Sequence, residues 1–276
     1  MAGPPEGLSG LLASMSAFDE AATGCISVRA LHRIRTLSVR DDALIWVRKG
    51  CKTLLGAQGP QEVPAGRVVV LARGSCWDVI NDPRSDGRYE AHVLQFGDAA
   101  VSRFAARHGG DFPQAPLQDA RVLTPDGGLA ECLERTLAGL AAPGLSQGLR
   151  QHRVEEVLLM LAEAGCVLRP RGVPDWPEQV RRLILGRPHA EWTVETIAAA
   201  CQVSASTLRR RLAAHGLACA ALVREVRLEV GLGLLQSTGL PVGEIAARCG
   251  YDSHSRFTAA FRSRFGFAPS RLRGPG

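Results

Sequence analysis

Two short stretches of this 276-residue chain carry polar and basic residues opposite an apolar stripe. Leu208 and Leu212 stand four residues apart in the first stretch, which is the spacing of one buried helical face, and Phe257 and Phe261 repeat it in the second. The opposite faces would expose Ser206, Arg209 and Arg210 in the first stretch, and His254, Ser255 and Arg256 with nearby Arg262 in the second. Arginine can donate to guanine O6 and N7, and serine or histidine can contact base edges or phosphates. These faces suit a DNA major groove, although any single arginine is also compatible with an ordinary solvated charge.

The residues that would position these faces form an internal repeat. Its two copies consist of Ile197, Ala198, Cys201, Val203, Ser204, Leu208 and Leu212, and of Ile245, Ala246, Cys249, Tyr251, Ser253, Phe257 and Phe261. Matching positions lie 48 residues apart up to the turn and 49 apart after it. Ser204 and Ser253 can each cap a helix by accepting a hydrogen bond from a backbone N–H. The pattern predicts two helix-turn-helix motifs; one copy alone could be a plain helical packing unit, but two copies favour DNA binding.

Charge is segregated in the same way. From Asp175 to the end there are 14 arginines and 8 acidic residues, whereas the first 174 residues hold 19 basic and 19 acidic residues, so the net charge of +6 resides in the part with the repeat. Neutralising phosphates supplies the sequence-independent part of DNA affinity. A basic segment joined to a neutral one indicates a nucleic-acid module attached to a second domain.

The stretch from about Glu191 to Arg273 resembles the DNA-binding domain of the AraC/XylS family of bacterial transcription regulators. The resemblance is carried by Pro241 to Ser253, followed by Phe257, Phe261, Phe265-Gly266 and Pro269. It implies that two recognition helices enter successive major grooves and that a long helix, about Cys219 to Gln236, joins them. The start at Glu191-Trp192-Thr193 and the run from Leu208 to Leu212 look closest to the branch with virulence and acid-resistance regulators.

Site residues follow from this resemblance position by position. Those expected to read bases are Ser206, Arg209, Arg210, His254 and Ser255. Those expected to contact phosphates are Thr193, Arg256, Arg262 and Arg264. Ala259 stands where the family usually has a polar or basic contact, which puts base reading by the lower half of the second helix in doubt. The implied partners are double-stranded DNA and RNA polymerase, and the implied role is that of an activator.

The N-terminal part predicts short strands and turns followed by helices. Strands are expected around Ile34 to Ser38, Ala43 to Val47, Arg67 to Leu71 and Tyr89 to Phe96, with turns at Pro64-Ala65-Gly66 and Asp86-Gly87. This pattern resembles the cupin-like sensory barrel of the same family. Apolar stripes at helical spacing follow, at Leu129 to Leu140 and at Val154 to Leu161, and either cover the barrel or form a dimer interface.

The sequence therefore predicts an α+β chain with a cupin-like β-barrel and packed helices, followed by an all-α domain with two helix-turn-helix motifs. We expect a sensory or oligomerisation domain at 1–168 (barrel about 25–100, helices about 118–166), a linker at 169–177 and a DNA-binding domain at 178–276. The chain has no membrane-length apolar run and no signal-peptide pattern, so we expect a cytoplasmic protein without membrane association.

The function of the N-terminal domain is left open between a small-molecule sensor and a dimerisation or protein-interaction module. Arg48, Lys49, Lys52 and Arg67 are candidates for binding an anionic effector at a barrel mouth, with a solvated basic rim as the alternative. A cupin-type enzyme would need converging histidines, and the strand region offers only His32 and His92 without an H-x-H pair. We therefore expect no enzymatic activity, no cofactor and no metal. The eight cysteines form no C-x-x-C pair, and Cys201 and Cys249 are expected to pack in the turns.

Overall fold

The computed structural model describes residues 20–57, 59–142, 144–170, 172 and 174–273. The described residues divide into two compact units, which are treated separately. Residues 20–170 with 271–273 form the N-terminal unit, and 172–270 form the C-terminal unit. No helix among the described residues is long and apolar enough to cross a membrane.

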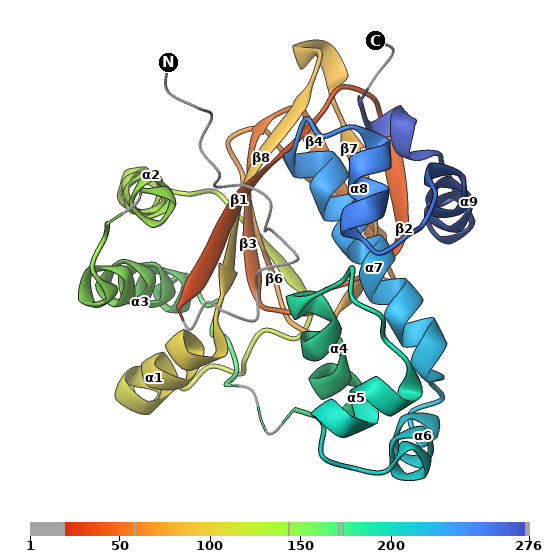
Figure 1. Ribbon diagram of the computed structural model, residues 1–276. Helices are drawn as coiled ribbons and strands as arrows, with labels where there is room; N and C mark the ends of the chain where they lie inside the picture. Colours follow the sequence, from red (N-terminus) through yellow and green to blue (C-terminus); the bar gives the residue numbers. More distant parts are fainter. Residues whose placement is uncertain (1–19, 58, 143, 171, 173, 274–276) are drawn as a thin grey trace. The chain divides into compact units, whose positions relative to one another are not determined.

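The N-terminal unit is built on two antiparallel sheets (Figure 1). The strands of the five-stranded sheet, in spatial order, are β1 (Ala21–Val28), β8 (Tyr89–Phe96), β3 (Ala43–Lys49), β6 (Val68–Leu71) and β9 (Ala120–Leu123). Those of the four-stranded sheet are β2 (His32–Ser38), β7 (Cys76–Asp82), β4 (Cys51–Gly56) and β5 (Gly59–Pro64). The mixed α and β composition is as expected. The strand pairing gives two separate sheets among the described residues, and the closed barrel expected from the sequence is not formed by this pairing.

The strands recognised in the sequence are those with the most regular apolar pattern. Strand β8 has the predicted bounds, Tyr89–Phe96, and pairs with β1 on one side and β3 on the other. The other strands carry polar or glycine residues among their apolar ones and were not predicted; they are β1, β4, β5, β7 and β9. Strand β9 also falls within the range expected to be helical; it is strand because it pairs with β6, with Val122 opposite Val69.

Three helices pack on one face of the five-stranded sheet: α1 (Asp98–His108), α2 (Gly127–Ala141) and α3 (Gln147–Glu163) (Figure 1). Alternation along the strands places Leu44, Trp46 and Leu94 on this face, where they share one buried cluster with Leu133 of α2 and Leu161 of α3. The two predicted apolar stripes therefore cover a sheet. Helix α1 was not predicted, because its buried side is limited to Ala100, Val101 and Phe104.

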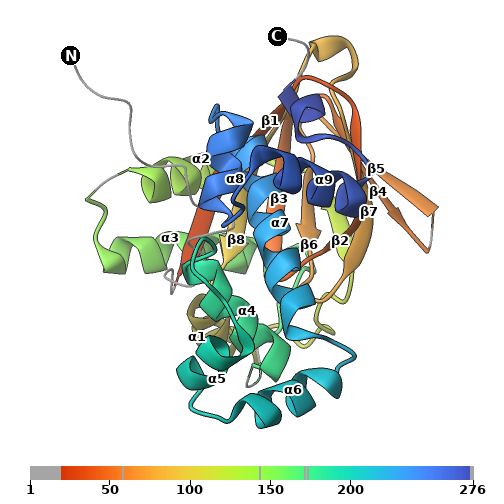
Figure 2. The same ribbon diagram turned by 45° about the vertical axis from the view of Figure 1, so that its right-hand side comes forward.

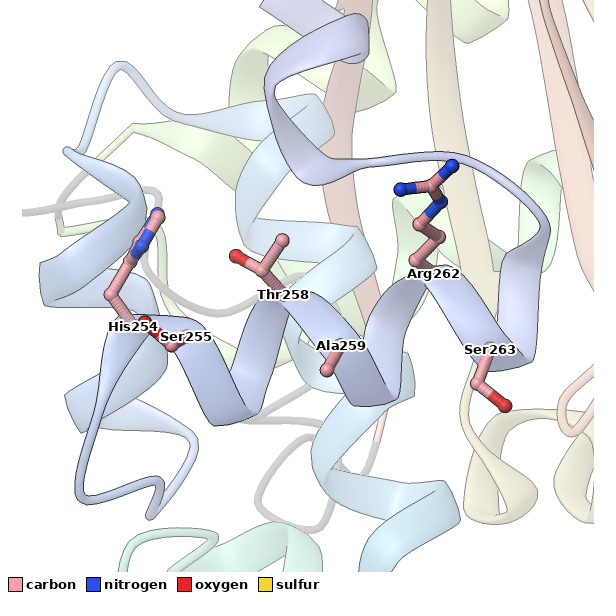
Figure 3. Close-up of a pocket in the computed structure, with 6 residues that line it drawn as sticks. All are labelled: His254, Ser255, Thr258, Ala259, Arg262 and Ser263. Atoms are coloured by element: carbon pink, nitrogen blue, oxygen red, sulfur yellow. The ribbon is translucent and has the colours of Figure 1, made fainter.

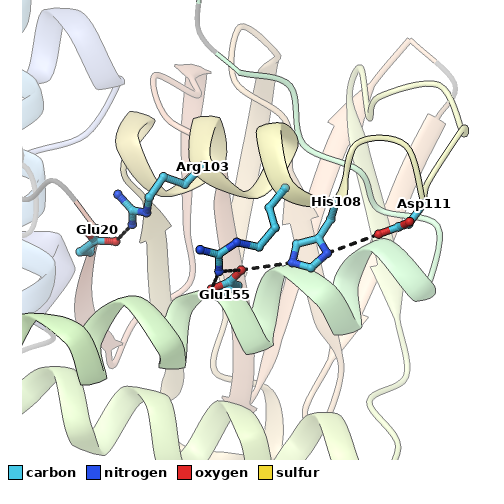
Figure 4. A network of polar contacts seen from close by, with 6 residues as sticks. Glu20, Arg103, His108, Asp111 and Glu155 are labelled. Carbon is cyan, nitrogen blue, oxygen red and sulfur yellow. Dashed lines mark hydrogen bonds and ion pairs between the residues drawn. The ribbon is translucent and has the colours of Figure 1, made fainter.

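A polar network fastens α1 to its neighbours (Figure 4). The Arg103 guanidinium donates to the buried carboxylate of Glu20, at the start of β1. One turn further on, Arg107 donates to Glu155 of α3 at 2.6 Å, and the His108 ring lies 3.1 Å from the same carboxylate. These contacts tie α1 to both the sheet edge and α3. Burial raises the pKa of Glu155, but the hydrogen bonds from His108 and Arg107 outweigh this and lower it overall.

The C-terminal unit is helical in its described part. Its helices are α4 (Trp176–Gly186), α5 (Val194–Ala200), α6 (Ala205–Ala213), α7 (Cys219–Ser237), α8 (Val242–Arg248) and α9 (His254–Phe265). A short 3-10 turn, Pro269–Arg273, begins at the end of this unit. Helix α7 is the long central one, with α5 and α6 at one end and α8 and α9 at the other (Figures 1 and 2). Helix α4 begins inside the segment expected to be a linker, because the Asp175 carboxylate accepts from the Glu178 N–H and Pro177 suits the first turn of a helix.

Candidate nucleic-acid interface

The first helix-turn-helix, α5 with α6, is fixed by side-chain caps. The Thr193 hydroxyl accepts from the Thr196 N–H at 3.1 Å, and the Thr196 hydroxyl accepts from the Thr193 N–H at 2.9 Å, which closes a capping box. Ser204 caps α6 as predicted, by accepting from the Thr207 N–H at 3.2 Å. The Thr193 hydroxyl, expected to contact a phosphate, thus already holds the start of α5.

Helix α6 buries one face and exposes the other. Leu208 and Leu212 are fully buried, as the spacing predicts. On the opposite side Ser206, Arg209 and Arg210 are exposed. Arg209 donates to Glu195 of α5 at 3.1 Å, and both side chains remain more than half exposed. The first set of base-reading candidates therefore shares one accessible face.

The second helix-turn-helix, α8 with α9, has an aromatic core. Ser253 caps α9 by accepting from the Arg256 N–H at 3.2 Å. Phe257 and Phe261 are fully buried with ring centroids 5.5 Å apart. Phe261 in turn contacts Phe265 and Phe267. This cluster replaces the two leucines of the first copy and fixes which side of α9 faces outward.

The outward side of α9 forms a shallow hollow (Figure 3). Its lining residues are His254, Ser255, Thr258, Ala259, Arg262 and Ser263. Three of them were expected from the sequence as DNA contacts, namely His254, Ser255 and Arg262, and all three are exposed. Thr258 and Ser263 were missed, although both lie four residues from a lining residue and the helical period could have identified them.

The remaining arginines have different surroundings. Arg256 is exposed and lies 3.5 Å from the exposed Asp252. Arg264 is only partly exposed and forms a two-pronged ion pair with Glu225 of α7, at 2.8 and 2.9 Å from its Nε. This pair favours a structural role for Arg264 over the phosphate contact expected for it. Arg211 stacks on the Trp176 ring of α4 at 4.1 Å and so belongs to the interior side of α6.

Corresponding turns in the two motifs adopt the same unusual backbone. Gln202 has φ 55° and Gly250, its counterpart 48 residues later, has φ 75°. Only glycine adopts this region without steric cost. At Gly250 a Cβ would lie 2.8 Å from the Pro188 carbonyl oxygen, beside the Arg227 guanidinium. Burial raises the pKa of the adjacent Cys249 thiol to about 12, so Cys249 stays protonated and behaves as a packing residue.

The four candidates for an anionic effector in the N-terminal unit have different surroundings. Arg48 stacks on Trp46 at 4.1 Å and pairs with Glu134 of α2. Lys49 lies 3.6 Å from Glu90, and Arg67 is exposed. Lys52 is instead buried on the four-stranded sheet. Lys52 thus differs from the other three candidates, which are exposed.

Lys52 belongs to a buried polar group between the two sheets. Its ammonium donates to Asn81 Oδ1 at 2.7 Å, and the Asn81 amide lies 3.3 Å from His32 Nε2. The Tyr89 ring of the opposite sheet lies 5.4 Å from the ammonium, and in the described part of the structure the buried Tyr89 hydroxyl has no hydrogen-bond partner. Burial lowers the pKa of Lys52 to about 7 and that of His32 to about 4. Sequence reasoning missed this group, because lysine is rarely interior.

Comparison with known proteins supports the repeat-based interpretation. Residues 197–274 match a family model described as a helix-turn-helix domain. The chain is 30% identical over 96 residues to the urease operon transcriptional activator of Escherichia coli, covering 35% of this chain and 32% of that protein. It is 33% identical over 144 residues to the ornithine utilization regulator of Pseudomonas aeruginosa, covering 52% of this chain and 39% of that protein. The matches thus span well under half the length of these relatives.

A solved structure resembles nearly the whole chain. ToxT from Vibrio cholerae aligns over 91% of this chain and 97% of its own with a TM-score of 0.61, at 16% sequence identity. This likeness concerns the fold. The helix-turn-helix match and the curated relatives, which are named as transcription regulators, confirm the resemblance of residues 197–274 to an AraC-type DNA-binding domain.

Proposed function

We propose that the protein is a sequence-specific, DNA-binding transcription regulator that uses α6 and α9 as recognition helices in successive major grooves. The observation that carries the proposal is the pair of capped helices, each with a fully buried apolar face opposite an exposed polar one, at the two ends of α7. Ser206, Arg209, Arg210, His254 and Ser255 would contact bases. Arg256 and Arg262 would contact phosphates, and Thr193 would position α5.

The proposal is tested by selecting from a library of randomised DNA duplexes with the 276-residue chain and by mapping the bound sites in a genome. We expect one enriched asymmetric sequence with two recognised segments. Failure to enrich any sequence above the library background would overturn the proposal. We further propose that the protein activates transcription, which the name of the urease operon activator supports, and that RNA polymerase is its partner. A reporter gene placed downstream of the selected site, measured with and without the protein, tests whether the protein activates transcription.

For the N-terminal unit we propose a cupin-like sensory domain that binds a small carboxylate. Lys52 is buried, its hydrogen-bond partner Asn81 is neutral, and the nearby Tyr89 hydroxyl lacks a partner among the described residues. A ligand carboxylate would satisfy both groups. One of the similar ToxT structures is described as bound to an unsaturated fatty acid, which supports an acid as the class of ligand.

This proposal predicts saturable thermal stabilisation of the chain by carboxylates, and its loss in Lys52→Met. The alternative is that the unit serves only for dimerisation, which the exposed Leu149 of α3 would favour. In that case a concentration-dependent mass is expected without stabilisation by any acid.

A further inference from the structure

The two recognition faces expose different chemistry. The α6 face presents two exposed arginines, Arg209 and Arg210, near its middle. The α9 face has its charged and polar groups at its ends, with His254 and Ser255 at the start and Arg262 near the close (Figure 3). Its middle is occupied by Thr258 and Ala259. The long side chains that could bond a base edge are therefore absent from the centre of the second face.

The centre of the α9 face exposes apolar groups. The Thr258 Oγ1 is buried and has no hydrogen-bond partner in the described part of the structure, although the residue as a whole is partly exposed. What Thr258 offers to a partner is therefore carbon, chiefly its methyl group. Ala259 is exposed and can offer only a methyl group. The two residues thus contribute methyl groups to the lining of the hollow.

This surface matches one feature of the major groove. The C5-methyl of thymine is the apolar group on that edge of DNA, and alanine or threonine methyl groups pack against it. Guanine and adenine are instead read by paired hydrogen bonds from arginine or from an amide side chain. The centre of α9 supplies neither kind of donor. The two arginines of α6 supply the donors that guanine requires.

We propose that the operator has two half-sites of opposite composition, with guanine against Arg209 and Arg210 of α6, and thymines whose C5-methyl groups pack against Thr258 and Ala259 of α9. The inference rests on the proposed function, because it specifies the DNA that the same two faces bind. Arg256 and Arg262 flank the methyl surface and supply phosphate contacts, so the second half-site gains affinity without a long base-reading side chain.

The test uses the duplex selected by the 276-residue chain. Each thymine is replaced in turn by deoxyuridine, which removes only the C5-methyl, and each guanine by 7-deazaguanine, which removes only the N7 acceptor. The half-site in which Arg209→Ala abolishes the 7-deazaguanine penalty is the one bound by α6. In the other half-site, deoxyuridine should weaken binding roughly threefold to fivefold for each packed methyl.

Protein variants identify the residues that meet those methyl groups. Thr258→Ser removes the methyl and keeps the hydroxyl, and it should abolish the deoxyuridine penalty at one thymine. Ala259→Gly should abolish it at another. Ala260→Gly is the matched control, because it carries the same cost of glycine in a helix but lies outside the hollow, and it should keep both penalties.

The outcomes separate the inference from the function on which it rests. If selection enriches no sequence, the proposed function fails. If a site is enriched but deoxyuridine is tolerated throughout the α9 half-site, the thymine contacts are wrong while the regulator assignment stands. If no guanine penalty depends on Arg209, the guanine half of the inference is overturned.

Discussion

Arg209, Arg210 and Arg211 are consecutive in sequence and yet have three different surroundings. Arg211 stacks on Trp176, Arg209 bonds Glu195, and Arg210 is exposed. Helical geometry turns each residue by about a quarter of a turn from the last, so neighbours in sequence face different partners. The basic run of α6 therefore divides into one packing residue and two exposed residues that we propose to contact DNA.

The first prediction separates base reading from phosphate binding. Arg209→Ala should cost about 1 to 3 kcal/mol on the selected site and much less on random DNA, because the lost contact is to a base. Arg262→Ala should weaken binding to both and reduce the dependence of log affinity on log salt by about one unit, because it removes a phosphate contact. Fluorescence anisotropy over a salt series measures both effects. Equal losses on the two DNAs for Arg209→Ala would contradict its role.

The second prediction concerns Lys52. Its pKa is about 7 in the folded chain and about 10.5 in the unfolded chain, so between these values the unfolded chain binds a proton that the folded chain does not. Above pH 10.5 Lys52 is neutral in both states and does not change the free energy of unfolding. As the pH drops to 7, the free energy of unfolding falls by an amount on the order of several kcal/mol. Lys52→Met should flatten this slope between pH 7 and 10, as measured by urea unfolding.

Lys49→Met is the matched control for that measurement. Lys49 is the other lysine of the chain, and its side chain is 47% exposed beside Glu90. A change of slope in Lys52→Met that Lys49→Met does not reproduce is therefore assigned to the buried lysine. The titration of His32, with a pKa of about 4, falls in a separate acidic range and does not interfere. A parallel pH dependence in the wild type and in Lys52→Met would show that Lys52 is not the group that causes the slope.

The sequence predicted the exposure of the DNA-binding candidates, but it did not predict that one effector candidate, Lys52, is buried. Ser206 and His254 could be placed because the apolar residues four apart fix which side of each helix is buried. Lys52 could not, because the alternation that turns it inward belongs to β4, a strand the sequence does not reveal. The ion pair of Arg264 with Glu225 could not be predicted, because the two residues lie 39 positions apart in sequence.

A glycine of α7, Gly231, faces the aromatic core that α9 contributes. A Cβ at Gly231 would lie 2.7 Å from Cε2 of Phe257, a fully buried ring. Glycine normally weakens a helix by about 0.5 to 1 kcal/mol relative to alanine. Its presence in the middle of α7 is explained by this contact, which allows the aromatic core of the second motif to approach the central helix.

The third prediction follows from this contact. Gly231→Ala should lower the free energy of unfolding by about 1 to 3 kcal/mol, because the added methyl overpacks a filled core. Gly243→Ala, in α8 with no neighbouring atom within 4 Å of its Cβ, should be neutral or slightly stabilising. Urea unfolding of both variants gives the comparison. A stabilised Gly231→Ala would mean that Phe257 moves aside at little cost.

The elements that the sequence predicted correctly are those whose pattern depends on one buried face. The ends of β8 and the four helices of the two motifs follow from alternation, from helical spacing and from serine caps. Helix α1 and strand β9 depend on partners distant in sequence, such as Glu155 for α1 and Val69 for β9. Local propensity does not encode those partners, so these elements were missed.

At the scale of the whole molecule, two recognition helices belong to a single chain and are joined by α7. In the proposed mode of binding they occupy grooves about one helical turn apart, roughly 10 to 10.5 base pairs. A monomer can then fill both half-sites, and the operator has no need of a palindrome.

The fourth prediction tests this spacing. Inserting five base pairs between the two half-sites turns the second groove to the far side of the duplex, so the contribution of α9 should be lost. Ser255→Ala should then weaken binding to the original duplex but not to the one with the insertion. Inserting ten base pairs is the control, because it increases the distance between the half-sites without rotating the second groove. Helix α9 should fail to reach the second groove in that duplex too. Footprinting that shows one contacted groove on the original duplex would limit recognition to a single helix.

The first motif is packed by leucines and the second by phenylalanines, so the two motifs are not equivalent. A symmetric dimer binds a palindrome equally in both orientations. One chain with two different recognition helices binds its operator in a single orientation. Inverting its operator would leave affinity unchanged while turning the rest of the protein toward the opposite flank. Orientation relative to the start of a gene would thus decide the outcome for transcription, independently of occupancy.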